Sequence, residues 1–255
     1  MPIGALGGLV GLGGGEFRLP VLMYAIGFDP KSAIPLNLMV SFVTLAFSLM
    51  IRSHTLSVSA LIAYAPEIAG LAAGGLVSAF CGARLVGALS SARLVQIIGL
   101  LLAGLGCLML VEVAQPFAYA GLVPAGRSAH LAIGVLLGLG IGLVSSMLGV
   151  AGGELLIPTM MFIFGADIKT AGTASILISL GVVLSGLWRY WRMGSIPSGR
   201  GVARITSAMG AGSIIGALLG GFVVGFAPIA FLKVLLGCVL LAAAAKTITG
   251  HQRAR

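Results

Sequence analysis

Long apolar runs dominate this chain and limit what it can fold into. Of its 255 residues, 59% are hydrophobic and only 8% are charged, whereas a soluble domain carries about 25% charged residues. A membrane helix needs ~20 apolar residues, and most runs reach that length. We therefore predict an all-α polytopic membrane protein rather than a soluble, disordered or β-barrel protein. The runs lie at residues 3–28, 33–51, 56–83, 94–113, 131–166, 170–188, 205–226 and 229–245.

Composition also argues against metal, cofactor, nucleic-acid and enzymatic functions. Cys81, Cys107 and Cys238 all lie inside apolar runs with no metal-ligand spacing, so we predict no metal and no cofactor. The net charge of +9 could suit nucleic acid, but the Lys and Arg residues lie mostly between apolar runs. Cytoplasmic loops of membrane proteins show this pattern, so we predict no nucleic-acid partner. The three histidines lie at run ends, which argues against an enzyme.

The chain is internally duplicated. Residues 11–33 (GLGGGEFRLPVLMYAIGFDPKSA) align without a gap on residues 149–171 (GVAGGELLIPTMMFIFGADIKTA), at an offset of 138, with ten of 23 positions identical. The same offset pairs later residues such as Ser41 with Ser179. We therefore predict two membrane repeats of four segments each, residues 1–126 and 127–255, the second ending in a short basic tail.

Consecutive glycines interrupt the first segment of each repeat. Gly13–Gly15 cannot hold a straight helix at low cost, and we read residues 151–153 in the same way. Non-helical backbone at membrane depth is tolerated only where it is buried in protein or lines a cavity. Each repeat therefore opens with a broken helix, in which Glu16 or Glu154 lies in the first turn of the second half, where the helix dipole favours an acid.

The topology follows from the length of one run and from the positive charges. A helix over residues 131–166 would be roughly 54 Å long, against ~30 Å of hydrocarbon, which favours a re-entrant hairpin and hence inverted repeats. With Arg18 and Lys233 set aside, the hairpin model places ten Lys and Arg residues on one side and three on the other; parallel repeats, the alternative, give nine and four. Both models place the C-terminus and the loop at residues 189–204 in the cytoplasm, for a multi-pass protein of the cell inner membrane.

The doubled segments GLGGGEFRLPVL and GVAGGELLIPTM resemble those of the sulfite exporter TauE/SafE family, also called the TSUP permeases. In that family a Gly-rich segment with a following proline opens each half of a duplicated membrane protein, and small polar residues follow in the next helix. Here these are residues 33–41 and 171–179. The resemblance covers nearly the whole chain and implies transport of small sulfur-containing anions such as sulfite, thiosulfate or organosulfonates.

The glycine breaks are candidates for the anion site. Half-helix N-termini present unpaired N–H groups and partial positive charge, as in other broken-helix transporters, whereas close helix packing is the alternative. We also predict that the two breaks meet near the bilayer midplane across one cavity, where a β-branched side chain at Gly15 or Gly153 would block the substrate. The candidate residues are Gly13, Gly14, Gly15, Gly152 and Gly153.

Polar side chains of the following helices are further candidates. Asn37 with Ser41, and Ser175 with Ser179, are i, i+4 pairs on one helix face at equivalent repeat positions, and Thr173 lies beside the second pair. Such groups could donate hydrogen bonds to sulfite or sulfonate oxygens. Interhelical hydrogen bonds, or bonds to carbonyls four residues earlier, are the alternative.

Three charged residues lie inside the broken segments. Glu16 and Glu154 suit proton coupling or helix capping, because a carboxylate inside the membrane is costly and usually functional. Arg18 has Leu156 as its repeat partner, so it breaks the symmetry. It would either pair with Glu16 or contact the anion directly.

These features favour a secondary transporter of a small anion that works by alternating access between the repeats. The chain has no Walker motif and no room for an ATPase domain. A passive anion channel and a membrane scaffold or assembly protein are the alternatives. The expected partners are the anion and the lipid bilayer, with a homodimer as an open alternative to a monomer.

Overall fold

The computed structural model describes residues 14, 15, 18, 22, 26–28, 30–55, 58–85, 91–114, 126–148 and 150–253. Over these residues the regular structure is helical throughout, as the apolar runs predict, and no strand occurs. The elements are α3 (Pro30–Thr55), α4 (Val58–Ala63), α5 (Ala65–Leu85), α6 (Ser91–Ala114), α7 (Arg127–Leu148), α8 (Gly153–Pro158), the π-helical η3 (Thr159–Ile163), α9 (Ile168–Arg192), α10 (Arg200–Phe226) and α11 (Ile229–Arg253).

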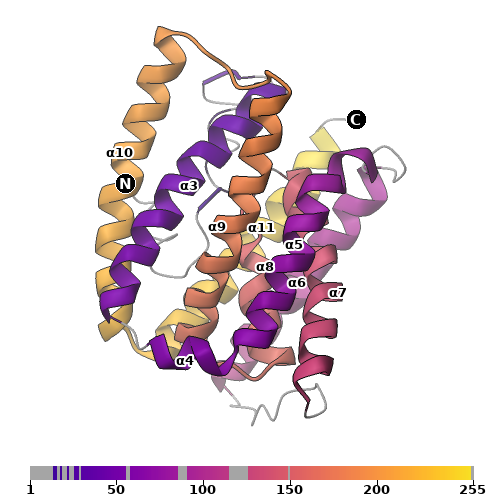
Figure 1. Ribbon diagram of the computed structural model, residues 1–255, viewed down its shortest axis with the longest axis vertical. Helices are drawn as coiled ribbons and strands as arrows, with labels where there is room; N and C mark the ends of the chain where they lie inside the picture. The colour runs from indigo at the N-terminus through magenta and orange to yellow at the C-terminus, as the bar shows by residue number, and fades with distance from the viewer. Residues whose placement is uncertain are drawn as a thin grey trace.

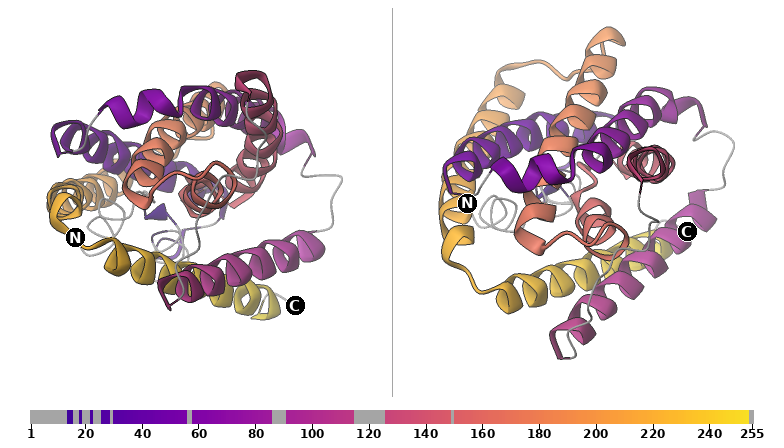
Figure 2. Two further views of the ribbon diagram at one scale, coloured as in Figure 1. Left: turned by 90° about the horizontal axis from the view of Figure 1, so that it is seen from below. Right: turned by 60° about the horizontal axis from the view of Figure 1, so that its bottom comes forward.

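The long helices run up and down one bundle (Figure 1). Helix α3 descends in this view and packs against α9, which ascends, and against α10, which descends. Helix α5 packs along α7 and also contacts α9, while α8 packs on α9. Helices α6 and α11 pack together away from α3, as both views of Figure 2 show. Helix α9 is therefore the central element, in contact with both parts of the bundle.

Helices at equivalent positions of the sequence repeat pack against one another. Helix α9 begins 138 residues after α3, and α11 begins 138 residues after α6. Each of these pairs is in contact and antiparallel (Figure 1). The residues 138 positions after α5 lie within α10. Helix α5 contacts α9, and α10 correspondingly contacts α3. The contacts between the two halves are therefore reciprocal.

Glycines bring the backbones of α5 and α7 close together. A Cβ atom built on Gly138 would lie 2.4 Å from the carbonyl oxygen of Leu71, and one built on Gly142 would lie 2.6 Å from that of Gly75. From the other side, a Cβ on Gly74 would lie 2.2 Å from the carbonyl oxygen of Val135. Small residues allow such approach between membrane helices, so these glycines serve packing.

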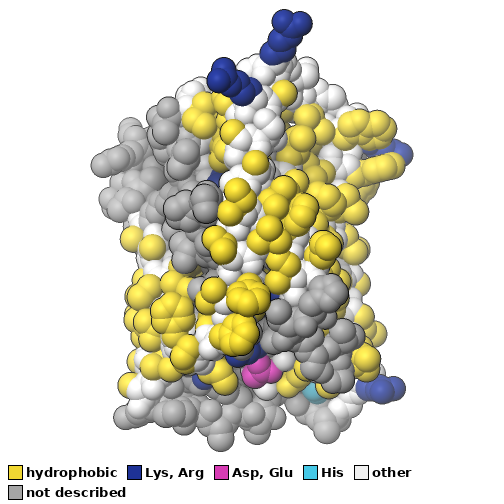
Figure 3. Space-filling view, turned by 90° about the vertical axis from the view of Figure 1, so that its left-hand side faces the viewer, with side chains coloured by type: hydrophobic (Ala, Val, Ile, Leu, Met, Phe, Trp, Pro, Cys, Tyr) yellow, Lys and Arg dark blue, Asp and Glu magenta, His cyan; other side chains and the backbone are white. Residues whose placement is uncertain are grey.

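The outer surface suits a hydrocarbon environment. Four helical segments are long and apolar enough to cross a membrane, and shorter apolar helices accompany them. Large side chains such as Leu184, Phe222 and Phe226 are exposed on the helices. In Figure 3 hydrophobic side chains cover the middle of one face, and most charged side chains lie near its ends. The four segments are Ser32–Arg52, Arg127–Ser146, Ile168–Arg192 and Arg200–Val224.

The long run at 131–166 is interrupted at Gly152, where the glycines predict a break. Helix α7 ends at Leu148, residues 150–152 are non-helical, and α8 begins at Gly153. Gly152 has φ +79°, a left-handed conformation that glycine adopts without steric cost. The His130 and Phe164 rings lie 5.9 Å apart, so the start of α7 and the end of η3 are neighbours.

Two sequence-based boundaries differ from the structure. The run at 56–83 is not one helix, because Tyr64 separates α4 from α5. The polar residues 52–54 do not end their helix, since α3 continues to Thr55 and Arg52 is only 1% exposed. A charged residue therefore lies inside the packed protein at a point where the sequence suggests a loop.

Candidate functional site

A buried guanidinium brings together residues of three segments. Arg18 is 2% exposed. Its Nη1 donates hydrogen bonds to Thr44 Oγ1 at 2.8 Å and to Ser213 Oγ at 3.0 Å. Its Nη2 donates to Ser41 Oγ at 2.6 Å, and its Nε to Asn37 Oδ1 at 3.4 Å. These residues and Gly15 form the Arg18 cluster. These four acceptors are neutral side-chain oxygens.

Helical spacing on α3 builds one wall of the Arg18 cluster. Asn37, Ser41 and Thr44 follow one another at intervals of four and three residues, and all are fully buried. This spacing places them on one helix face. Thr44 also donates to the carbonyl oxygen of Val40 at 2.8 Å, the local bond common for a helical threonine. Its hydroxyl oxygen therefore remains oriented to accept from the guanidinium.

Gly15 completes the Arg18 cluster from the first broken segment. Its carbonyl oxygen accepts a hydrogen bond from Asn37 Nδ2 at 3.1 Å. A Cβ atom there would lie 3.0 Å from that nitrogen and 3.3 Å from Ser41 Oγ. The absence of a side chain therefore lets the backbone approach the polar face of α3. The structure thus joins four predicted site residues, namely Gly15, Arg18, Asn37 and Ser41.

The second broken segment has a different polar environment. Gly152, Gly153 and Glu154 are buried at the start of α8, and Glu154 is 5% exposed. Glu154 Oε1 is buried and has no hydrogen-bond partner among the described residues; the same is true of Ser145 Oγ. A Cβ on Gly152 would lie 2.1 Å from that Ser145 oxygen. Buried polar groups in this state are uncommon and costly.

The predicted polar face of α9 lies in the interior. Thr173 is 4% exposed, and Ser175 and Ser179 are fully buried. Thr173 Oγ1 accepts from Arg52 Nη1 at 3.2 Å and donates to the carbonyl oxygen of Lys169 at 2.9 Å. Ser179 Oγ has no partner within the described part of the chain. Thr173 therefore bonds both to its own helix backbone and to a buried cation, and its role in substrate binding stays a prediction.

Three sequence-based predictions concern residues that the structure covers only in part. Gly14 is buried with φ +69°, which agrees with a break at this position. Gly13 and Glu16 lie outside the described residues, so pairing of Arg18 with Glu16 stays a prediction. The meeting of both breaks across one cavity also stays a prediction.

Sequence reasoning missed Thr44, Ser213 and Arg52. Thr44 continues the face of Asn37 and Ser41, so a longer i, i+4, i+7 search could have found it. Ser213 is 195 residues away from Arg18, and no local pattern connects the two. Arg52 lies 121 residues before its partner Thr173. Arg52 directly follows the apolar run 33–51, where a charged residue is typical of a loop.

A cavity of about 40 Å³ lies between α3, α5, α9 and the end of α7. Ser145 lines it next to the second break, and Arg189 and Tyr190 line it near the end of α9. Gly186 of α9 and Leu38 of α3 also line it. A Cβ atom built on Gly186 would lie 3.4 Å from Leu38 Cδ1. The cavity therefore joins the polar surroundings of Gly152 to the end of α9.

A family model described as "Sulfite exporter TauE/SafE" matches residues 1–247. No curated protein and no solved structure matches the chain. The match includes both glycine breaks, the polar residues of α3 and α9, and all the apolar helices. The chain therefore belongs to the sulfite exporter TauE/SafE family of membrane permeases, which are transporters rather than enzymes.

Proposed function

We propose that this protein is a secondary transporter of small anions, with sulfur oxyanions and organosulfonates as its substrates. The observation that carries the proposal is the Arg18 cluster, a buried cation beside a glycine break in a protein of a sulfite exporter family. The substrate would bind between the guanidinium and the hydroxyl and amide groups of Asn37 and Ser41. These are among the residues that the sequence repeat marks independently.

The chemistry of a guanidinium suits this substrate class. Its planar set of N–H donors matches two oxygens of an oxyanion, and such charge-assisted bonds are among the strongest hydrogen bonds in proteins. Within the bundle, low effective dielectric strengthens the attraction to an anion. The hydroxyls of Ser41, Thr44 and Ser213 now accept from Arg18. A bound oxyanion would take over those guanidinium donors, and the hydroxyls would turn to donate to it.

Alternating access between inverted repeats is the mechanism that we propose. The reciprocal, antiparallel packing of α3 with α9 and of α6 with α11 supports it, since inverted repeats have a two-fold axis in the membrane plane. The contact between His130 and Phe164 supports a re-entrant hairpin, because it brings both ends of the segment to one side. Movement of one repeat against the other would then expose the Arg18 cluster to each side in turn.

The orientation follows from the distribution of charge. Arg189 and Arg192 at the end of α9 and Arg200 and Arg204 at the start of α10 lie at the same end of the bundle as the C-terminal end of α11 (Figure 1). Positive loops favour the cytoplasm. Trp188 and Trp191 are exposed here, and Arg192 lies over the Trp188 ring at 5.2 Å. We therefore assign this end to the cytoplasmic side of the inner membrane.

Glu154 is our candidate for proton coupling at the substrate site. It is buried at the start of α8, and Oε1 has no hydrogen-bond partner among the described residues. A proton carried by this carboxylate together with the anion would reduce the charge moved across the membrane. Glu16 occupies the equivalent position in the first repeat.

Counterflow in proteoliposomes tests the proposal. Vesicles loaded with unlabelled sulfite should take up labelled sulfite transiently above equilibrium, because a carrier exchanges one anion for another. Gly15→Val should remove this uptake, since a side chain there would lie against Asn37 and Ser41. Single-channel currents without counterflow would instead identify a channel. No flux of sulfite, thiosulfate, sulfate or sulfonates would contradict the proposal.

A further inference from the structure

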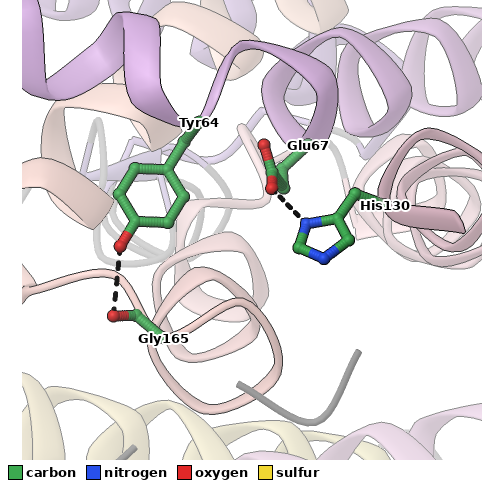
Figure 4. A network of polar contacts seen from close by, with 4 residues as sticks. All are labelled: Tyr64, Glu67, His130 and Gly165. Carbon is green, nitrogen blue, oxygen red and sulfur yellow. Dashed lines mark hydrogen bonds and ion pairs between the residues drawn. The ribbon is translucent and has the colours of Figure 1, made fainter. Parts of the chain in front are cut away.

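A buried acid lies at the end of the bundle opposite the basic loop. Glu67, in the first turn of α5, is 4% exposed and contacts Nδ1 of His130 in the first turns of α7 (Figure 4). The other carboxylate oxygen, Oε2, is buried without a hydrogen-bond partner among the described residues. The Arg18 cluster and α8 use neither residue. The Glu67 carboxylate and the His130 imidazole therefore form an acid–base pair inside the packed protein.

Neighbouring contacts connect this pair to the second broken segment. The Tyr64 hydroxyl donates to the carbonyl oxygen of Gly165 at 3.2 Å (Figure 4). The His130 ring lies 5.9 Å from the Phe164 ring. These contacts hold together the start of α5, the start of α7 and the residues after η3. We call Tyr64, Glu67, His130, Phe164 and Gly165 the α5–α7 latch.

An open pocket of about 800 Å³ lies beside the latch, and Glu67 and His130 both line it. Arg127 and Gly126 at the start of α7 line it as well, as do Ile62 and Pro66. His130 is 23% exposed in its side chain. Protons can therefore reach the pair from this side of the membrane, although the carboxylate itself is buried.

We infer that Glu67 and His130 bind a proton exchanged through this pocket, and that this proton strengthens the α5–α7 latch and closes this side of the transporter. A protonated imidazole and an ionised carboxylate form a charge-assisted hydrogen bond, which is roughly twice as strong as a neutral one. Loss of the proton weakens the contact between α5 and α7 and frees the end of η3 to move. The gating part of this inference rests on the transport proposed above, whereas the proton site itself does not.

Other ionisable groups near the latch have separate tasks. Burial raises the pKa of the Tyr64 hydroxyl, and the carboxylates of Asp167 and Glu67 raise it further, so Tyr64 stays a donor at neutral pH. Asp167 accepts from the backbone N–H groups of Lys169 and Thr170 as the cap of α9. Arg127 is exposed at the pocket. His130 is therefore the group of the latch that both contacts the Glu67 carboxylate and lines the open pocket.

Thermal melting of the purified protein against pH tests the proton site without any transport assay. In the wild type, the Tm should fall by about 3 °C between pH ~5.5 and pH ~8, as the charge on the imidazole is lost. Glu67→Gln and His130→Gln should each remove this difference. Tyr64→Phe is the matched control, because it breaks the bond to Gly165 but leaves the titratable pair, so its Tm should be lower at every pH with the same pH difference.

A swapped pair keeps the test decisive if the single variants unfold. The double variant Glu67→His with His130→Glu should fold and recover the pH-dependent Tm. An unchanged pH dependence in the single variants, or a swapped protein no more stable than they are, would overturn the proton site. In proteoliposomes, acid on the pocket side should slow anion flux at least threefold in the wild type but not in His130→Gln. Equal slowing in both would overturn the gating role while leaving anion transport itself intact.

Discussion

Equivalent positions of the two broken segments carry different chemistry. Arg18 in the first segment donates to four side-chain oxygens, whereas Leu156, 138 residues later, is an apolar core residue that is 2% exposed. Gly14 and Gly152 share a left-handed conformation, with φ +69° and +79°. A left-handed glycine is thus common to both segments, but the position four residues later carries a buried cation in the first and a buried leucine in the second.

The neighbouring helices differ in the same way. Thr44 of α3 accepts from Arg18, while its equivalent in α9 is Val182. Ser41 accepts from Arg18, but its equivalent Ser179 has no partner among the described residues. Duplication has therefore supplied a symmetric frame, and substitutions have made the interior asymmetric. We therefore predict one anion site per chain, built mainly from the first repeat.

Replacing Arg18 with leucine, the residue at the equivalent position 156, should have the largest effect on anion transport. Arg18→Leu removes the charge and leaves buried hydroxyls without their donor. Truncation of one partner of a buried, hydrogen-bonded charge pair costs ~2–5 kcal/mol of binding free energy in comparable cases. We expect anion flux to fall by about 100-fold or more. Arg18→Lys keeps the charge but not the planar set of donors, so it should retain about a tenth of the flux. Arg204→Gln, at an exposed arginine, should transport like the wild type; equal losses in all three variants would contradict the assignment.

The second break should be more sensitive to a side chain than an ordinary helical glycine. Gly152→Ala forces a positive φ on alanine and places its Cβ about 2.1 Å from Ser145 Oγ, which should destabilise the protein by about 2–3 kcal/mol. The control is Gly140→Ala in α7, where a Cβ would meet nothing within 4 Å. Thermal melting in detergent measures both. A Gly152→Ala protein as stable as the control would show that the break is not strained.

Removing the charge at the second break should change the pH dependence of transport more than its rate. Glu154→Gln keeps the size of the side chain but cannot ionise. We expect the flux to lose the part of its pH dependence that proton coupling causes, to keep the slowing by acid on the pocket side, and to change less than tenfold at its optimum. Measuring labelled sulfite flux between pH 5 and 8 in wild type and variant checks this. A pH profile identical to that of the wild type would exclude Glu154 as the coupling group.

The smallest effect should come from the helix cap that follows the second break. Asp167 accepts from Lys169 N at 2.9 Å and from Thr170 N at 3.1 Å. Asp167→Ala should therefore cost about 1 kcal/mol of stability and leave substrate affinity unchanged. Asp167→Asn, which can still cap, should lie between wild type and alanine in melting temperature. A large loss of transport in the asparagine variant would assign Asp167 a role beyond capping.

The sequence predicted the features that repeat or that depend on local spacing. Long apolar runs predicted the helical membrane fold, and the glycines predicted the interruption at Gly152. The i, i+4 spacing of Asn37 and Ser41 placed both on one face, and the structure shows that face turned toward Arg18. Asp167 lies between two apolar runs, where an aspartate is typical of a helix N-cap, and it caps α9.

Long-range packing could not be predicted in the same way. Ser213 reaches Arg18 because α10 packs on α3, and a single sequence does not specify which helices become neighbours. Arg52 appeared to belong to a loop, because a charge at the end of an apolar run normally marks a membrane boundary. It is buried, and its Nη1 donates to Thr173 of α9. Glu67 has no acidic counterpart in the second repeat, so the duplication did not point to it.

Equilibrium binding of labelled sulfite to the purified protein tests the asymmetric anion site most directly. The account predicts saturable binding with one sulfite per chain, lost in Arg18→Leu and retained, more weakly, in Arg18→Lys. Size-exclusion profiles would show that each variant is still folded. Two equivalent sulfites per chain, or binding that is unchanged in a folded Arg18→Leu protein, would contradict the account.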